Sequence, residues 1–260
     1  LVSGSYDGKL IWWDIQKKAA IRSVEAHKKW IRGVFASPDG KTLASVADDM
    51  VCRLWNAATG KQLLELKGHQ EKTPNDFPSM LYAAAFSADG KYLATGDKIG
   101  KVIIWDTATG KQVGVCEAPV MYTWDPVQRI HSIGGIRSLA FSPDGVSLAV
   151  GGMGKVGNID HLEGKTRVEV FDWKKGKQTH EFSSDKFRGL INHLEFHPKG
   201  EWLVGAGGAG DGVLAFYSLT SKKALREEKV PMHVHDLCLS DDCATLYLVG
   251  HNRLAIYEMK

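Results

Sequence analysis

The sequence predicts an all-β fold assembled from a unit that recurs about every 40–50 residues. A Ser-Pro-Asp-Gly turn occupies residues 37–40 and returns, intact or altered, at 87–90, 142–145, 197–200 and 240–243. Six apolar runs end in an aromatic residue and a polar one, at Trp13-Asp14, Trp55-Asn56, Trp105-Asp106, Phe171-Asp172, Tyr217-Ser218 and Tyr257-Glu258. Several short strands at this spacing are typical of the blades of a β-propeller.

The second unit shows most clearly why each segment is a strand. Its expected strands are residues 31–36, 42–46, 51–55 and 62–66. These runs are rich in aliphatic and β-branched side chains, and glycine and aspartate stand between them, where the backbone must reverse. One such sheet cannot bury both of its faces, so the sheets are expected to stack around an axis. Alternating helical patterns are absent, which argues against βαβ folds.

Counting strands gives six blades in one domain that spans residues 1–260. The expected blades are residues 1–26, 27–68, 69–118, 119–182, 183–230 and 231–260. The first lacks its first strand and the last lacks its fourth. The chain begins without methionine inside an expected strand, so we expect the N-terminal part to be missing and the intact protein to have seven blades. A six-bladed ring that needs two more strands is the alternative.

Composition excludes several classes of function. The chain is 43% hydrophobic and 24% charged, which is ordinary for a soluble globular protein. A net charge of +3 gives no reason to expect a nucleic-acid or membrane partner. No apolar run approaches the ~18 residues of a membrane-spanning helix. The four cysteines have neither zinc-site nor redox spacing, and we expect no metal and no cofactor. The compartment stays open, with the cytoplasm favoured.

The units resemble WD40 repeats over essentially the whole chain, in a style similar to bacterial members. That family buries a hydrogen-bonded set made of a histidine, a serine or threonine, an aspartate and a tryptophan. The resemblance implies this set at His27, Ser45, Asp49 and Trp55 in the second unit, at Ser3, Asp7 and Trp13 in the first, and at His69, Thr95 and Trp105 in the third. In the third unit, Ile99 stands where the aspartate is expected.

A serine, a histidine and an aspartate in one set also suggest a hydrolase. No nucleophile-elbow sequence accompanies them, and buried polar networks are usually satisfied parts of the scaffold. We therefore assign the set to folding.

Departures from the repeat predict the functional face. Residues 70–79 and 119–134 lengthen the connections between units, and residues 153–165 lengthen one inside the fourth unit. In this architecture all three loops lie on one face, called the top in the WD40 family. A binding face is often marked by such insertions.

A second set of residues stands at the start of the first strand of each unit. The hypothesis is that the top face binds a protein or peptide through these residues together with two aromatic residues of the connection 119–134. The set is Trp30, Arg32, Met80, Tyr82, Tyr122, Trp124, Arg137, Asn192, His233 and His235. Aromatic and arginine side chains are those that interface hot spots favour. Packing of the strand edges is the alternative explanation for them.

The sequence thus predicts a non-catalytic, monomeric WD40 scaffold with a protein or peptide partner. One alternative is a hydrolase or lyase at the channel mouth, which would use His131, Asp160, His161, His233 and His235. Another is a regulatory domain of a larger chain. Residues 164–166, Gly-Lys-Thr, resemble the end of a phosphate-binding loop, but Ile159 stands where that motif requires a glycine. The glycine-rich residues 205–212 are expected to form a flexible turn on the top face.

Overall fold

The computed structural model describes residues 1–221 and 223–259, and within them it has strands β1 to β24 and no α-helix. Six of the sheets have the order expected of four-stranded or truncated blades, and within each sheet every strand pairs antiparallel with the next in the chain. The predicted all-β class is confirmed. No helix of the described residues is long and apolar enough to cross a membrane.

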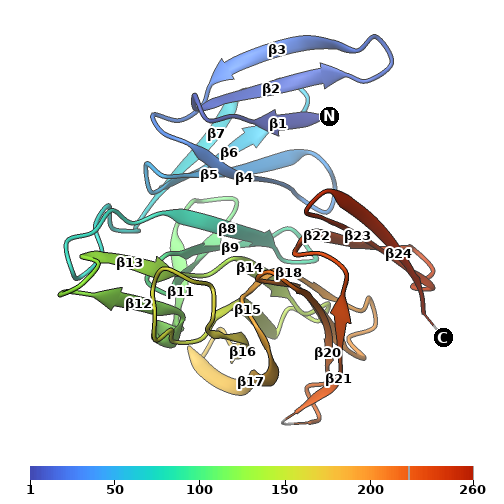
Figure 1. Ribbon diagram of the computed structural model, residues 1–260. Helices are drawn as coiled ribbons and strands as arrows, with labels where there is room; N and C mark the ends of the chain where they lie inside the picture. The colour runs from blue at the N-terminus through green and yellow to red at the C-terminus, as the bar shows by residue number, and fades with distance from the viewer. Residues whose placement is uncertain (222, 260) are drawn as a thin grey trace.

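The strands fall into six blade-like sheets and one hairpin (Figure 1). The first sheet contains β1 (Val2–Gly4), β2 (Lys9–Asp14) and β3 (Ala19–Glu25); the second contains β4 (Ile31–Ala36), β5 (Thr42–Ala47), β6 (Val51–Asn56) and β7 (Gln62–Lys67). The third contains β8 (Leu81–Phe86), β9 (Tyr92–Asp97), β10 (Lys101–Asp106) and β11 (Gln112–Glu117). The short 3-10 helix η1 (Pro119–Met121) leads into the hairpin of β12 (Tyr122–Asp125) and β13 (His131–Gly134).

The remaining three sheets complete the chain. The fourth contains β14 (Ser138–Phe141), β15 (Ser147–Met153), β16 (Lys165–Asp172) and β17 (Lys177–Arg188); the fifth contains β18 (Leu190–Phe196), β19 (Leu203–Gly208), β20 (Gly212–Tyr217) and β21 (Ala224–Val230). The sixth contains β22 (Val234–Leu239), β23 (Thr245–Gly250) and β24 (Arg253–Glu258). Lys260, which was expected to end this unit, lies outside the described residues.

The recurring turn closes each first hairpin with the same hydrogen bonds. Ser37 Oγ donates to Asp39 Oδ1 at 2.7 Å and accepts the backbone N–H of Thr42 at 2.9 Å. The same pair of contacts recurs in the turns that start at Ser87, Ser142 and Ser240. The Ser-x-Asp spacing therefore recurs because it satisfies the turn's backbone donors locally.

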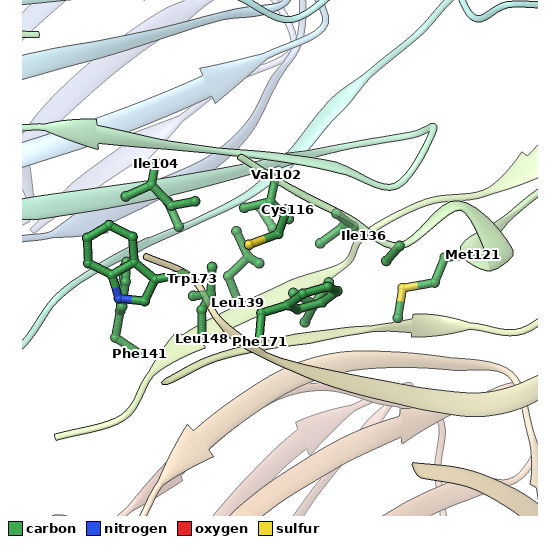
Figure 2. Packing of buried hydrophobic residues seen from close by; sticks show 14 residues of the cluster. Val102, Ile104, Cys116, Met121, Ile136, Leu139, Phe141, Leu148, Phe171 and Trp173 are labelled. Carbon is green, nitrogen blue, oxygen red and sulfur yellow. The ribbon is translucent and has the colours of Figure 1, made fainter. Parts of the chain in front are cut away.

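Successive sheets pack through their first strands, β1 against β4, then β8, β14, β18 and β22 in turn. A separate apolar cluster fills each gap between neighbours. Figure 2 shows the one between the third and fourth sheets, where the labelled side chains include Val102, Ile104, Cys116, Leu139, Leu148, Phe171 and Trp173. The indole Nε1 of Trp173 donates to the carbonyl of Gly145 at 2.8 Å, so this bulky side chain is buried without losing its hydrogen bond.

Two expectations about segments are wrong. Strand β17 continues to Arg188, through the expected boundary between residues 182 and 183, because Lys165 of β16 still pairs with Arg188. The glycine-rich segment is mostly strand, since residues 205–208 belong to β19 and only 209–211 form the turn. A Cβ atom on Gly207 would lie 1.9 Å from the carbonyl oxygen of Leu190, so close packing against β18 explains a glycine there.

Candidate functional site

Four side chains of the second sheet form a continuous hydrogen-bonded chain. Trp55 Nε1 donates to Ser45 Oγ at 2.8 Å, and this hydroxyl lies 2.6 Å from His27 Nε2. His27 Nδ1 lies 3.0 Å from Asp49 Oδ1. If the serine hydroxyl donates to Nε2, the proton on Nδ1 donates to the carboxylate, and each donor meets an acceptor. The network links two loops to β5 and β6.

The environment of Asp49 favours its charged form. Burial acts to raise the pKa of this carboxyl, but the contact with His27 and the backbone N–H of Lys28 outweigh it. Arg53 Nη1, 3.1 Å from Asp49 Oδ2, acts in the same direction. The pKa of Asp49 is therefore held well below its ordinary value.

The third sheet has the same network, and the expectation that its aspartate is missing is wrong. Trp105 Nε1 donates to Thr95 Oγ1 at 2.9 Å, and Thr95 Oγ1 lies 2.8 Å from His69 Nε2. Asp97 Oδ2 lies 2.7 Å from His69 Nδ1. Asp97 ends strand β9, two positions before Ile99, so a comparison of turn positions alone does not find it.

The first sheet retains only part of the set. Trp13 Nε1 donates to Ser3 Oγ at 2.8 Å, as Trp55 does to Ser45. The side chain of Asp7 is 54% exposed and accepts the backbone N–H of Lys9 at 3.1 Å. Asp7 thus caps a turn at the surface, and its carboxylate differs from those of Asp49 and Asp97 in burial.

The three long connections contact one another. We call residues 70–79, 119–134 and 154–164 the loop cluster. Tyr122 Oη lies 3.0 Å from both Thr73 Oγ1 and Asn75 Oδ1, and these hydrogen-bond contacts join the first loop to the hairpin. The backbone N–H of Val156 donates to Thr123 Oγ1 at 3.2 Å, which joins the hairpin to the third loop.

Charged groups of the proposed enzyme alternative also lie in the loop cluster. Asp160 forms an ion pair with Arg129, whose Nε lies 2.6 Å from Oδ2, and His131 Nε2 lies 3.5 Å from the other carboxylate oxygen. His161 is exposed beside them. Among residues 1–221 and 223–259, no three histidine, cysteine, aspartate or glutamate side chains are placed to hold a metal ion.

A cavity of about 640 Å³ opens where the first strands converge. We call it the channel mouth, lined by Arg32, Tyr82, Arg137, Asn192, His233 and His235 among others. A deeper cavity of about 390 Å³ continues between β4, β8, β14 and β18 and shares Arg137 and Asn192. Six of the ten residues of the top-face hypothesis thus meet at one opening, although they come from five sheets.

β-Bulges explain how these side chains reach the mouth. The pairing register of β4 shifts between Ile31 and Gly33, which leaves Arg32 as the extra residue. The same shift occurs around Tyr82 in β8, Asn192 in β18 and His235 in β22. A bulge redirects a side chain at the rim of a sheet and interrupts pairing there. The repeated bulge therefore directs one equivalent side chain to the opening in four of the sheets, and Arg137 joins them from the start of the fourth sheet, where no such shift is found.

Arginine and aromatic side chains alternate along one wall of the mouth. The guanidinium carbon of Arg32 lies 4.4 Å from the ring centroid of Trp30 and 5.6 Å from that of Tyr82. The guanidinium carbon of Arg137 lies 3.7 Å from the Tyr82 centroid. Met80 lies beneath this row, with its sulfur 2.8 Å from Tyr82 Oη. These contacts hold the cations against aromatic faces.

The opposite wall is built from amide and imidazole groups. Asn192 Nδ2 lies 2.8 Å from His233 Nε2 and donates to the carbonyl of Val234 at 2.7 Å. The rings of His233 and His235 stack with centroids 5.1 Å apart. Burial, followed by the charge of His235, lowers the pKa of His233, which favours the neutral ring.

The structure leaves four of the ten hypothesised binding residues outside the lining of the mouth and adds others that the sequence did not single out. Trp30 and Met80 contact Arg32 beside it. Tyr122 is held between loops, and Trp124 is 42% exposed on the hairpin. Asp48 pairs with Arg32, and the buried Lys98 occupies the equivalent position one sheet later, seven residues before the tryptophan in both cases. That equivalence is visible in the sequence once the tryptophans are aligned.

Comparison with known families agrees with this architecture. The family model described as WD domain, G-beta repeat matches residues 18–56, 60–106 and 124–156. These segments include both complete histidine–aspartate networks.

Three relatives illustrate the similarity. A guanine nucleotide-binding protein subunit beta of Oryza sativa subsp. indica is 32% identical over 168 residues, which is 64% of this chain and 42% of that protein. Nuclear distribution protein PAC1-2 of Uncinocarpus reesii is 31% identical over 56% of this chain and 32% of its own length. Apoptotic protease-activating factor 1 of Rattus norvegicus is 30% identical over 55% and 11%. The matches therefore span less than half of each relative.

Proposed function

This chain is a WD40 repeat protein, and from that premise we propose that it is a non-catalytic scaffold whose channel mouth and loop cluster bind a segment of another protein. The observation that supports this most is the repeated bulge, which turns Arg32, Tyr82, Asn192 and His235 toward one cavity. The bulge stands at equivalent positions in four of the six sheets, so the same redirection of a side chain is repeated. Bulges of this kind are found where a side chain must be presented.

The composition of the mouth suits a protein ligand. Tryptophan, tyrosine and arginine dominate the energetics of protein interfaces. Here they are already held in place by stacking, so little side-chain entropy is lost when a partner binds. The closely packed sheets beneath them contribute the same advantage on a larger scale.

The relatives agree with an interaction role. One is by name the beta subunit of a guanine nucleotide-binding protein, so it works as part of an assembly. The shared repeats support a protein-interaction scaffold for this chain as well, while the particular partner of that relative is not carried over.

A selection of binding peptides tests the proposal. A random-peptide phage library is selected on the immobilised chain, and the strongest binders are measured by fluorescence anisotropy. We expect Trp30→Ala combined with Tyr82→Ala to weaken binding at least about tenfold, because the tyrosine face of the mouth and the two rings that hold Arg32 are lost. The matched control is Val146→Ala, half exposed in the turn between β14 and β15. If the peptides bind the mouth variant with unchanged affinity and bind the control variant more weakly, the interaction lies on the other face.

A further inference from the structure

Two arginines of the channel mouth differ in how their donors are used. Arg32 donates from Nε and Nη2 to the two carboxylate oxygens of Asp48, at 2.8 and 2.7 Å. Arg137 Nη2 donates to the carbonyl of Gly134 at 3.2 Å. Its Nε is buried and has no hydrogen-bond partner within the part of the chain that the structure describes. Arg137 thus lines the cavity with a guanidinium whose hydrogen-bonding capacity is only partly used.

The repeat explains why Arg137 lacks a carboxylate. Asp48 stands two residues after Val46, which pairs with Cys52, and in the fourth sheet Met153 stands two residues after Gly151, which pairs with the equivalent Val168. Methionine provides no carboxylate at that position. In the intervening sheet, Lys98 takes the place of Asp48, which adds a cation.

The neighbourhood is consequently positive. Lys98 is 8% exposed, and its ammonium reaches only the carbonyl of Pro78, at 3.4 Å, among the contacts of the described residues. Burial and then the charge of Arg137 lower the pKa of Lys98. Burial also lowers the pKa of Arg137 itself. Arg32, Lys98 and Arg137 thus bring three positive charges together beside the single carboxylate of Asp48. A further negative charge would therefore be stabilised here.

The guanidinium of Arg137 has no carboxylate partner among the described residues, and its orientation is also fixed. It lies 3.7 Å from the centroid of Tyr82, which fixes its plane. Gly135 allows this approach, because a Cβ atom there would lie 3.1 Å from Tyr82 Cε2 and 2.7 Å from the Cα of Lys98. A fixed planar guanidinium is suited to a carboxylate, which accepts two parallel N–H bonds from it.

The other wall of the mouth does not compete for an anion. Asn192 and His233 are hydrogen-bonded to each other and to backbone. His193 forms an ion pair with Asp236, whose carboxylate also makes that side less favourable for a second negative group. The excess of positive charge over carboxylates therefore lies on the side of Arg137.

We propose that the channel mouth binds the carboxylate of an aspartate or glutamate side chain of the partner, held by the guanidinium of Arg137. This inference rests on the proposed function and names the chemistry of the ligand. The cavity of about 640 Å³ is larger than a carboxylate needs, and the remaining volume accommodates the rest of a peptide segment beside Tyr82 and Asn192.

The test uses the peptides selected on the intact chain. The strongest binder is synthesised in its acidic form and with each Asp or Glu changed to Asn or Gln. We expect the amide form to bind about tenfold or more weakly. Arg137→Gln should weaken binding of the acidic peptide by a similar factor. This variant should bind the acidic and amide peptides equally, which is the signature of a direct pair. Arg137→Lys should recover part of the loss, and Arg253→Gln on β24 should change nothing.

The outcomes separate the two proposals. Peptides that depend on Trp30 and Tyr82 but bind equally as acid and amide would overturn the carboxylate site and leave the scaffold function standing. Stronger displacement by sodium phosphate than by sodium chloride of equal ionic strength would also overturn it in favour of a free phosphate site. Failure to select any peptide that depends on the mouth would overturn the proposed function itself. The comparison of acid and amide peptides needs no protein variant, so it stands even if Arg137→Gln unfolds.

Discussion

The carboxylate of Asp97 lies 2.7 Å from Nδ1 of His69, although Asp97 ends a strand and the matching Asp49 lies in a turn. Both carboxylates also accept backbone N–H groups of the turn that follows, from Ile99 and Lys101 in one case and from Val51 in the other. The network thus needs an acid that can reach the histidine and the turn together. More than one sequence position meets that need.

Loss of the Asp97 carboxylate should destabilise the fold. The side chains of Asp97 and His69 are both 1% exposed, so Asp97→Ala leaves a buried imidazole N–H and two turn N–H groups without their acceptor. We expect the free energy of unfolding to fall by about 1–3 kcal/mol, measured by urea denaturation. Asp7→Ala is the matched control, because this aspartate is exposed, and its change should stay within about 0.5 kcal/mol. Equal effects of the two variants would contradict a stabilising network.

The low pKa of Asp49 makes a prediction about acid stability. Its pKa is lower in the folded chain than the ordinary value of about 3.9 in the unfolded chain. The charged carboxylate therefore contributes stability above that ordinary value, and the contribution is lost as the pH falls toward the folded pKa. The difference in unfolding free energy between the native chain and Asp49→Asn should shrink between about pH 5 and pH 2. A difference that stays constant over this range would show that the carboxylate's charge contributes nothing.

The glycines of the β19–β20 segment should differ sharply in tolerance. A Cβ atom on Gly207 would lie 1.9 Å from Leu190 O, whereas nothing lies within 4 Å of one on Gly210. We expect Gly207→Ala to cost about 1–3 kcal/mol through forced backbone shifts. Gly210→Ala should be neutral or stabilising by up to about 1 kcal/mol, because it restricts the unfolded chain. Thermal melts of the two variants side by side measure this, and similar melting temperatures would contradict the packing role of Gly207.

Much of the fold could be predicted because its signals are local. The strands expected at residues 31–36 and 62–66 correspond to β4 (Ile31–Ala36) and β7 (Gln62–Lys67). Turn residues mark where a strand must end, and alternating aliphatic residues mark where it runs. The hairpin of β12 and β13 was expected only as a long loop; in the structure the two strands pair, and side chains of β12 also bond to the neighbouring loops.

The candidate site was predictable in its residue types but not in its geometry. The positions of Arg32, Tyr82 and Asn192 follow from aligning the units, yet the bulges that aim them depend on pairing register, which the sequence does not specify. Lys98 looks like an ordinary turn lysine until its burial is known. Asp97 was missed for the same reason, because reach in space and not position in the repeat decides which acid meets His69.

The hydroxyl of Tyr122 should control the order of the loop cluster without controlling the fold. Tyr122 Oη contacts both Thr73 Oγ1 and Asn75 Oδ1 at 3.0 Å, so Tyr122→Phe removes these contacts and keeps the ring. We expect amide hydrogen exchange in residues 70–79 to become faster, while the strands β8 and β9 keep their protection. The free energy of unfolding should fall by only about 0.5–1.5 kcal/mol. Thr107→Val is a suitable control, since its hydroxyl donates to Gly90 O at 2.8 Å outside the loop cluster, and it should leave exchange in residues 70–79 unchanged. Unchanged exchange in Tyr122→Phe would mean that other contacts hold the first loop against the hairpin.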